Sequence, residues 1–285
     1  MAGLAARAPG LRQLTIVTTR LAVLGSPIAH SKSPALHAAA YEVLGLDWEY
    51  GRAEVDGAGL PAFIDGLTPE WRGLSLTMPL KWDVLPLLDA RHHLVDATGA
   101  ANTVVLENGR LSGFNTDVYG IMRSFQDHDV SLTGHALVLG AGATAGSAIA
   151  AAGLGGVGHV QIAARDLSKA DALGARLGVP WSVVPFDEVA GRPAPDYVIN
   201  TLPNGVPVPV AFPEEFRRTS VLFDVTYDPW PTPLASTWET TAINGLDMLV
   251  HQAVQQVRIF VSGDPEQEVP REAEVLAAMR ATVGL

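Results

Sequence analysis

Short apolar segments alternate with segments of helical periodicity through the first third of the chain. Residues 21–24, 48–55 and 73–77 have the length and composition of strands. Residues 35–44 and 59–66, which lie between them, repeat apolar positions with the spacing of an amphipathic helix. Strand and helix therefore follow each other in turn, and this order predicts a mostly parallel α/β sheet.

Residues 73–81 lead from the third of these strands into a helix expected over residues 81–88. Pro79 suits the first turn of a helix, and Thr77 either caps the helix or points its hydroxyl into a cleft. The positive end of the helix would disfavour the ammonium form of Lys81 and ease proton exchange. Taken alone, the segment favours an ordinary solvated lysine.

Polar residues precede two further predicted helices. Ser31 and Ser33 lie in a loop before residues 35–44, where spacing favours Ser33 as the helix cap and binding of a substrate carboxylate is the alternative. Asn108 and Gly109 predict a hairpin turn. Asp117 precedes a helix beginning near residue 118, and its position alone is explained by a role as the N-cap of that helix and nothing more.

A second pattern begins at residue 135. A strand over 135–139 leads into a glycine-rich loop at 140–146, a helix over 147–152 and a strand over 160–164. In this context the glycines predict a dinucleotide site: Gly140 for the tight turn, and Gly142 for access of backbone amides to a pyrophosphate. Ala145 or Gly146 would permit close packing of helix on sheet.

The end of the second strand of this unit indicates which cofactor is bound. Arg165 stands where an acidic residue would accept the ribose 2′-hydroxyl of NAD, and Lys169 follows one helical turn later. Two cations favour the 2′-phosphate of NADP. Asp166 leaves NAD possible if its carboxylate faces the ribose, and otherwise it caps the next helix.

The last third of the chain predicts strands at 197–201 and 221–225, an ordered proline-rich loop at 227–233 and two final helices. The first helix runs from about residue 245 to 261 and the second from 271 to 282. Gln252, on the first, is either solvated or directed into the cleft.

Composition narrows the functional class. The 285 residues carry a formal net charge of −11 and no long basic run, so we expect neither nucleic acid nor an anionic membrane as partner. The absence of cysteine excludes disulfides and thiolate chemistry and fits a cytoplasmic protein. Residues 1–20 lack the apolar core of a signal peptide and are expected to form an N-terminal tail.

From about residue 21 to its end, the chain resembles the shikimate dehydrogenase family. The resemblance rests on the joint order of several segments, namely residues 25–34, 77–81, 99–103, 115–117, the glycine loop, 227–234 and 245–252. It implies two α/β domains with the active site between them: a substrate-binding catalytic domain (21–116 plus 247–285) and a Rossmann-type NADP-binding domain (117–246). A monomer or homodimer is expected.

The resemblance also implies site residues and a reaction, the reversible NADPH-dependent reduction of 3-dehydroshikimate to shikimate. Lys81 and Asp117 would be the catalytic pair. Substrate would be bound by Ser31, Ser33, Ser75, Thr77, Asn102, Tyr227 and Gln252. The cofactor would be bound by Gly140, Ala141, Gly142, Ala143, Thr144, Ala145, Arg165, Asp166, Lys169, Thr201, Val225 and Gly245. No metal is implied.

Two positions depart from the family pattern. Ser75 replaces the usual asparagine and offers one hydroxyl in place of an amide, so a water would complete that contact. Asp166 replaces a hydroxyl donor to the 2′-phosphate. These departures keep open an NAD-dependent quinate/shikimate dehydrogenase. A non-catalytic module that senses a nucleotide or a cyclic acid is a more remote alternative, because both Lys81 and Asp117 are present.

Overall fold

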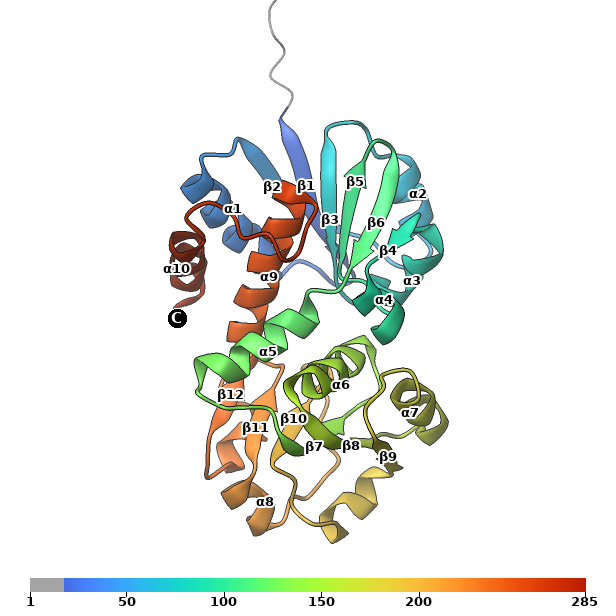
Figure 1. Ribbon diagram of the computed structural model, residues 1–285, viewed down its shortest axis with the longest axis vertical. Coiled ribbons are helices and arrows are strands. Elements are labelled where there is room, and N and C mark those ends of the chain that lie inside the picture. The colour runs from blue at the N-terminus through green and yellow to red at the C-terminus, as the bar shows by residue number, and fades with distance from the viewer. Residues whose placement is uncertain (1–17) are drawn as a thin grey trace, which may run out of the picture.

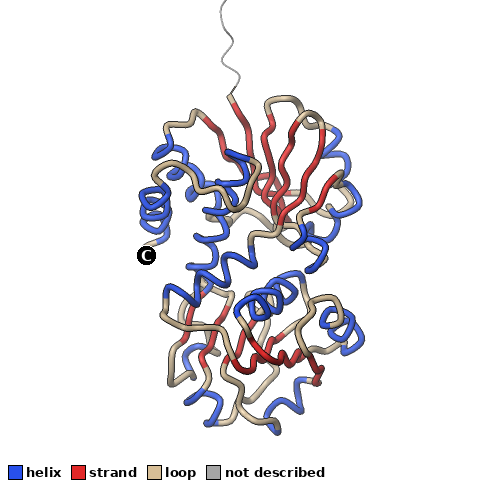
Figure 2. Tube along the Cα trace, in the orientation of Figure 1, coloured by secondary structure: helices blue, strands red, loops and turns tan. Residues whose placement is uncertain are grey.

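The computed structural model describes residues 18–285 and contains two six-stranded sheets, one in each half of an elongated molecule (Figure 1). Helices lie on both faces of each sheet and between the two sheets (Figure 2). The predicted N-terminal tail falls almost wholly outside the described residues, and the first strand begins at Thr19, two residues earlier than expected. Within residues 18–285 no helix is long and apolar enough to cross a membrane.

The first sheet has the order β2-β1-β3-β5-β6-β4. Its strands are β1 (Thr19–Gly25), β2 (Trp48–Glu54), β3 (Trp71–Leu76), β4 (Ala90–Arg91), β5 (Thr103–Glu107) and β6 (Arg110–Phe114). β1 pairs in parallel with β2 and β3, whereas β5 is antiparallel to β3 and β6. The prediction of a mostly parallel sheet is confirmed. The helices of this half are α1 (Ser33–Leu44), α2 (Leu60–Asp65), α3 (Leu80–Asp83) and α4 (His93–Thr98).

The antiparallel strand β5 is explained by the turn that follows it. Asn108 and Gly109 join β5 to β6 with positive φ angles of 51° and 74°, as a two-residue hairpin turn requires. The hairpin predicted from this dipeptide is confirmed.

The second sheet is entirely parallel and has the order β12-β11-β10-β7-β8-β9. Its strands are β7 (Gly134–Leu139), β8 (Val157–Ala163), β9 (Trp181–Val184), β10 (Tyr197–Asn200), β11 (Val221–Asp224) and β12 (Ala242–Asn244). This is the strand order of a dinucleotide-binding fold, with the switch point between β7 and β10. The helices α6 (Ala143–Gly155), α7 (Leu167–Gly174) and α8 (Glu214–Thr219) complete this half.

Two helices lie between the sheets: α5 (Asp117–Asp127) and α9 (Gly245–Ser262) pack against each other (Figure 1). α9 continues onto β3 and β5 of the first sheet, and α10 (Glu272–Val283) packs on α1 and α9. The buried guanidinium of Arg258 on α9 pairs with Glu272 on α10 at 2.5 Å. The last helices therefore pack back onto the first half of the chain, as expected.

The helix predicted over residues 81–88 is much shorter. α3 ends at Asp83 and a 3-10 turn follows at Leu85–Leu87. Pro86 has no amide to donate within a longer α-helix and its ring would clash with the preceding turn. Pro79 occupies the N-cap position, before the helix and not in its first turn. A single turn has little summed dipole, so the dipole argument made for Lys81 carries little weight.

The prediction of Ser33 as a helix cap is wrong. Lys32 occupies the N-cap position of α1 without a side-chain cap, and Ser33 is the first helical residue. Pro34, in the first turn, has no amide that needs a cap. The hydroxyl of Ser31 instead accepts a hydrogen bond from the amide of Ser33 at 3.3 Å.

His37 on α1 gives folding stability a definite pH dependence. The side chain is fully buried and stacked on Tyr50, and burial lowers its pKa from 6.5 to about 4. As the pH falls below 6.5, the unfolded chain binds the proton first, so stability decreases until the pH reaches the folded-state pKa. We expect His37 to account for a loss of about 3 kcal/mol of unfolding free energy over that range.

Denaturant unfolding of the wild type and of His37→Phe at the two ends of this pH range measures the effect. The variant keeps the aromatic stack and should lose less stability on acidification than the wild type. His93→Phe, at an exposed position on α4, serves as the matched control. Equal losses in wild type and His37→Phe would show that His37 is not the titrating group.

Candidate active site

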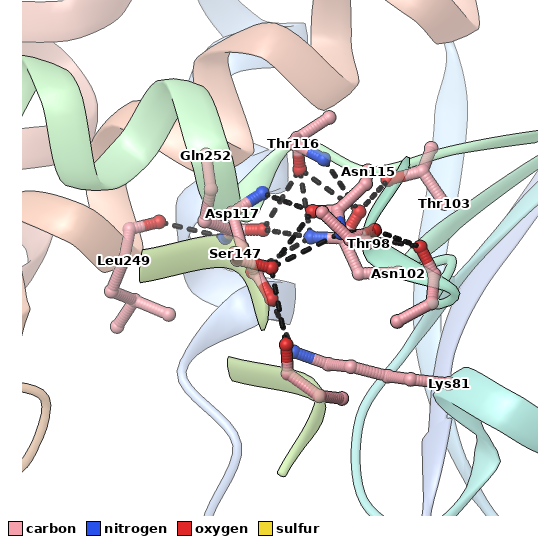
Figure 3. Close-up of polar contacts among 12 residues, drawn as sticks. Lys81, Thr98, Asn102, Thr103, Asn115, Thr116, Asp117, Ser147, Leu249 and Gln252 are labelled. Carbon is pink, nitrogen blue, oxygen red and sulfur yellow. Dashed lines mark hydrogen bonds and ion pairs between the residues drawn. The ribbon is translucent and has the colours of Figure 1, made fainter. Parts of the chain in front are cut away.

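A short ion pair joins the two predicted catalytic residues, Lys81 and Asp117. The Lys81 Nζ lies 2.5 Å from the Asp117 Oδ2, and the two side chains are only 14% and 5% exposed (Figure 3). Lys81 is carried by α3, immediately after β3, and Asp117 is the first residue of α5. Lys81 is therefore not a solvated surface lysine.

The interpretation of Asp117 as an N-cap is wrong. Thr116 occupies that position, and the Asp117 carboxylate is directed toward Lys81 and Asn102. The amide Nδ2 of Asn102 donates to the Asp117 Oδ1 at 2.9 Å and to the Thr116 Oγ1 at 2.8 Å. Both carboxylate oxygens are thus held by donors from the first half of the chain.

Asn102 and Asn115 fix the start of α5 (Figure 3). The Asn102 Oδ1 accepts from the amide of Thr116 at 2.9 Å, and the Asn115 Oδ1 accepts from the amide of Asp117 at 3.1 Å. Asn115 also donates to Ser147 on α6 at 3.1 Å, which ties this point to the second sheet. Gln252 of α9 lies at the edge of the cluster, with its Oε1 3.5 Å from the Asn102 Nδ2.

A cavity of about 1140 Å³ extends from Lys81 across the carboxyl ends of the second sheet's strands. This is where open parallel sheets bind ligands. Thirteen of the predicted site residues line it, namely Thr77, Lys81, Gly140, Ala141, Gly142, Ala143, Thr144, Arg165, Asp166, Lys169, Thr201, Val225 and Tyr227.

The glycine loop has the backbone geometry of a phosphate site. Gly140 has a φ of +108°, which favours glycine, and a Cβ there would lie 2.9 Å from the Thr201 Oγ1. Gly142 is the N-cap of α6, and apart from its own neighbours along the chain nothing lies within 4 Å of where its Cβ would be. The amides that open α6 are thus accessible to an anion. Ala145 is fully buried and packs in the core instead.

The two predicted cations, Arg165 and Lys169, both line the cavity. The carboxylate of Asp166 accepts from the amide of Lys169 at 2.9 Å, so Asp166 caps α7 as one of the two alternatives predicted. The Lys169 ammonium lies 4.5 Å from the centroid of the Trp82 ring, which belongs to α3 on the opposite wall. Arg165 is exposed beside them.

Other cavity residues were not predicted from the sequence. Trp82 and Met78 line the cavity and are large apolar side chains that are 42% and 57% exposed. Such exposure of apolar side chains indicates a binding site, and it can be seen only once the fold is known. Lys32 places its ammonium 5.4 Å from the centroid of Tyr227, across the cavity. Burial and then the neighbouring Asp228 raise the pKa of Tyr227, so its hydroxyl stays protonated at neutral pH.

The remaining predicted residues do not line the cavity. Ser31 and Ser33 flank Lys32, and Gly245 opens α9 with its amide 3.4 Å from the Thr226 carbonyl oxygen. Ser75 is 3% exposed and is hydrogen-bonded to Tyr50 and Gln256, two residues that the sequence gave no reason to select. Among residues 18–285, no cluster of three or more His, Asp or Glu side chains is arranged to hold a metal ion.

Comparison with known proteins agrees with this geometry. Residues 23–104 match the family model described as the shikimate dehydrogenase substrate binding domain. The shikimate dehydrogenase (NADP(+)) of Geobacter sp. strain M21 is 36% identical over 92% of this chain and 96% of its own length.

Two solved structures are also similar over most of both chains. Mycobacterium tuberculosis shikimate dehydrogenase is 37% identical with a TM-score of 0.77 and covers 92% of this chain and 99% of its own. Thermus thermophilus shikimate 5-dehydrogenase, solved with NADP(H) and shikimate, is 31% identical with a TM-score of 0.78 and covers 93% and 100%. This chain therefore belongs to the shikimate dehydrogenase family.

Proposed function

We propose that this protein catalyses the reversible NADPH-dependent reduction of 3-dehydroshikimate to shikimate, a step toward chorismate and the aromatic amino acids. The observation that carries the proposal is the buried ion pair of Lys81 and Asp117 at the end of the cavity that the glycine loop borders. The shikimate dehydrogenase relatives, one of them solved with NADP(H) and shikimate, support it.

The residues of the second half fit a bound NADP. The open glycine loop and the start of α6 would hold the pyrophosphate, and Arg165 and Lys169 would hold the 2′-phosphate. Ala141, Ala143, Thr144, Thr201 and Val225 would line the remaining length of the cofactor. When bound, NADPH supplies the hydride for the ring ketone.

Lys81 acts as the proton donor during reduction. Its ammonium would transfer a proton to the ketone oxygen as that oxygen becomes a hydroxyl, and neutral Lys81 would accept the proton in the reverse direction. Asp117 keeps Lys81 in place through the 2.5 Å contact, and its second oxygen is held by Asn102. The buried setting strengthens these contacts because water competes less there.

The substrate would lie between this pair and the polar residues of the first half. Ser31, Ser33 and Tyr227 would bind its carboxylate, while Thr77, Asn102 and Gln252 would contact its hydroxyls. Asn102 and Gln252 support this assignment, because both lie within hydrogen-bond range of groups that surround Asp117.

The domain limits are also a proposal. Residues 21–116 plus 247–285 would form the catalytic domain, and residues 117–246 the dinucleotide-binding domain. The division of the strands between the two sheets supports these limits, with β1–β6 in one and β7–β12 in the other. We further propose a cytoplasmic monomer or homodimer without nucleic-acid or membrane partners, in keeping with the net charge of −11 and the lack of cysteine.

An NAD-dependent quinate/shikimate dehydrogenase is the second candidate, since Asp166 adds a carboxylate beside the 2′-phosphate position. Its Oδ1 accepts from the amide of Lys169 as the cap of α7, and that structural use favours NADP over NAD.

Product analysis tests the proposed function. Purified protein supplied with NADPH and 3-dehydroshikimate should consume both and form shikimate, which chromatography against an authentic standard identifies. A reaction started with shikimate and NADP⁺ should run in reverse and reach the same equilibrium mixture of shikimate, 3-dehydroshikimate, NADP⁺ and NADPH. If no NADPH is consumed, or a different reduced product forms, the assignment fails.

A further inference from the structure

The family resemblance assigned Ser75 to substrate binding, but the hydroxyl of Ser75 is already engaged within the protein. It accepts from the Tyr50 hydroxyl at 2.6 Å and donates its only proton to the Gln256 Oε1 at 2.9 Å. Burial raises the pKa of Tyr50, so that hydroxyl remains a donor. Ser75 therefore has no proton left for a substrate oxygen.

The chain of hydrogen bonds continues from Ser75 to the catalytic pair. The Gln256 Nε2 donates to the Thr103 Oγ1 at 3.0 Å, and the Thr103 hydroxyl donates to the Asn102 Oδ1 at 2.9 Å. The Asn102 Nδ2 then donates to Asp117, which holds Lys81 (Figure 3). From Tyr50 to Asp117 every hydrogen bond of this path is donated in the same direction, and the Asn102 Nδ2 also donates to the Thr116 Oγ1.

The fold makes this chain possible by bringing three elements together. Ser75 on β3 and Thr103 on β5 are register partners in the first sheet, so their side chains lie side by side. Gln256 reaches both from α9, one turn beyond Gln252 and one turn before Phe260. A Cβ at Gly73 would lie 2.5 Å from the Phe260 ring, so glycine at this position allows α9 to lie directly on β3.

Gln256 is 2% exposed, and both ends of its amide are used. A buried amide held in this way resists rotation, because rotation would leave two buried groups without partners. Through Thr103 it acts together with the Thr116 amide, which donates to the Asn102 Oδ1 at 2.9 Å, to keep the asparagine oxygen toward Thr103 and the nitrogen toward Asp117.

We propose that Gln256 is a positioning residue for the reaction, and that Ser75 acts through Gln256 to hold Asn102 instead of binding substrate itself. This inference rests on the proposed function, since it concerns how the proposed substrate ligand Asn102 and catalytic Asp117 are oriented. Ser75 is shorter than the asparagine that is usual in the family, and in this chain its hydroxyl is hydrogen-bonded to a glutamine from α9.

A double-mutant cycle tests the proposal in the purified enzyme. Gln256→Met keeps the volume of the side chain and removes all the hydrogen bonds of its amide, and Ser75→Ala removes the upstream hydroxyl. Each single variant should raise KM for shikimate and lower kcat, with kcat/KM for shikimate down about tenfold and KM for NADP⁺ unchanged. The double variant should be no worse than Gln256→Met, because the two residues act in series.

Gln255→Met, at a buried neighbouring position on α9, is the control and should keep kcat/KM for shikimate near the wild-type value. If Ser75 binds substrate directly, Ser75→Ala would raise KM, Gln256→Met would not, and the effects would multiply in the double variant. That pattern of kinetic effects would overturn the inference. A loss of thermal stability in Gln256→Met with normal kinetics would also overturn it, since that marks a purely structural role.

A crystal structure of Gln256→Met gives a readout that does not depend on turnover. The inference predicts that the Asn102 amide rotates or takes two orientations, and an unchanged Asn102 contradicts it. Wild-type protein that fails to turn over shikimate would refute the proposed function, while the orientation of Asn102 in the variant would still decide the inference.

Discussion

Lys81→Ala is expected to lower kcat for shikimate oxidation by roughly 10²–10⁴-fold, the usual contribution of a positioned acid or base. KM for shikimate should change far less, because the carboxylate and hydroxyl contacts of the substrate are assigned to other residues. The geometric reason is that Lys81 is held 2.5 Å from Asp117 at the end of the cavity, and among residues 18–285 no second lysine pairs with that carboxylate. Steady-state kinetics with saturating NADP⁺ measures both quantities.

Asp83→Ala, in the same helical turn and exposed, is the control for disturbance of α3. It should retain the wild-type kcat. A Lys81→Ala enzyme with an unchanged kcat would remove Lys81 from the chemistry and leave the ion pair as a structural contact only.

Arg165→Ala is expected to have the second largest kinetic effect, and this effect should be confined to the binding of NADP⁺. A hydrogen bond to a charged group contributes about 1.5–3 kcal/mol, which corresponds to roughly 10–150-fold in affinity. We therefore expect KM for NADP⁺ to rise by a factor in that range, with little change in KM for NAD⁺, which lacks the 2′-phosphate. Lys169 remains as the second cation, which limits the loss.

Arg165→Lys separates charge from geometry. It keeps the positive charge but not the planar fork that binds a phosphate through two hydrogen bonds, so an intermediate KM for NADP⁺ is expected. If KM for both cofactors rose together in Arg165→Ala, the side chain would be holding the loop and not the 2′-phosphate.

The parts of the fold that depend on local sequence could be predicted. The glycine loop follows a buried strand and opens a helix, and each of these features is visible within about ten residues. The Asn108–Gly109 hairpin and the cap at Asp166 are equally local. The failures were also local: Pro86 ends the helix after Lys81, and Lys32 precedes α1 where Ser33 was expected.

The site itself depends on contacts that no local pattern contains. Lys81 and Asp117 are 36 residues apart, and Ser75 and Gln256 are 181 apart. Spacing alone left Lys81 as a surface residue and Ser75 as an ordinary strand residue, and only the resemblance to a family singled them out. Tyr50 and Gln256 could not be found in either way, because Tyr50 reaches Ser75 from β2 and Gln256 reaches it from α9, which packs on β3.

If the protein reduces 3-dehydroshikimate with NADPH at this cavity, its preference for that pair of reactants should be visible in one set of rates. The measurement is kcat/KM for 3-dehydroshikimate and 3-dehydroquinate, each with NADPH and with NADH. We expect the highest value for 3-dehydroshikimate with NADPH, and a lower value when either the substrate or the cofactor is exchanged. An equal or higher value with NADH, or with 3-dehydroquinate, would contradict it.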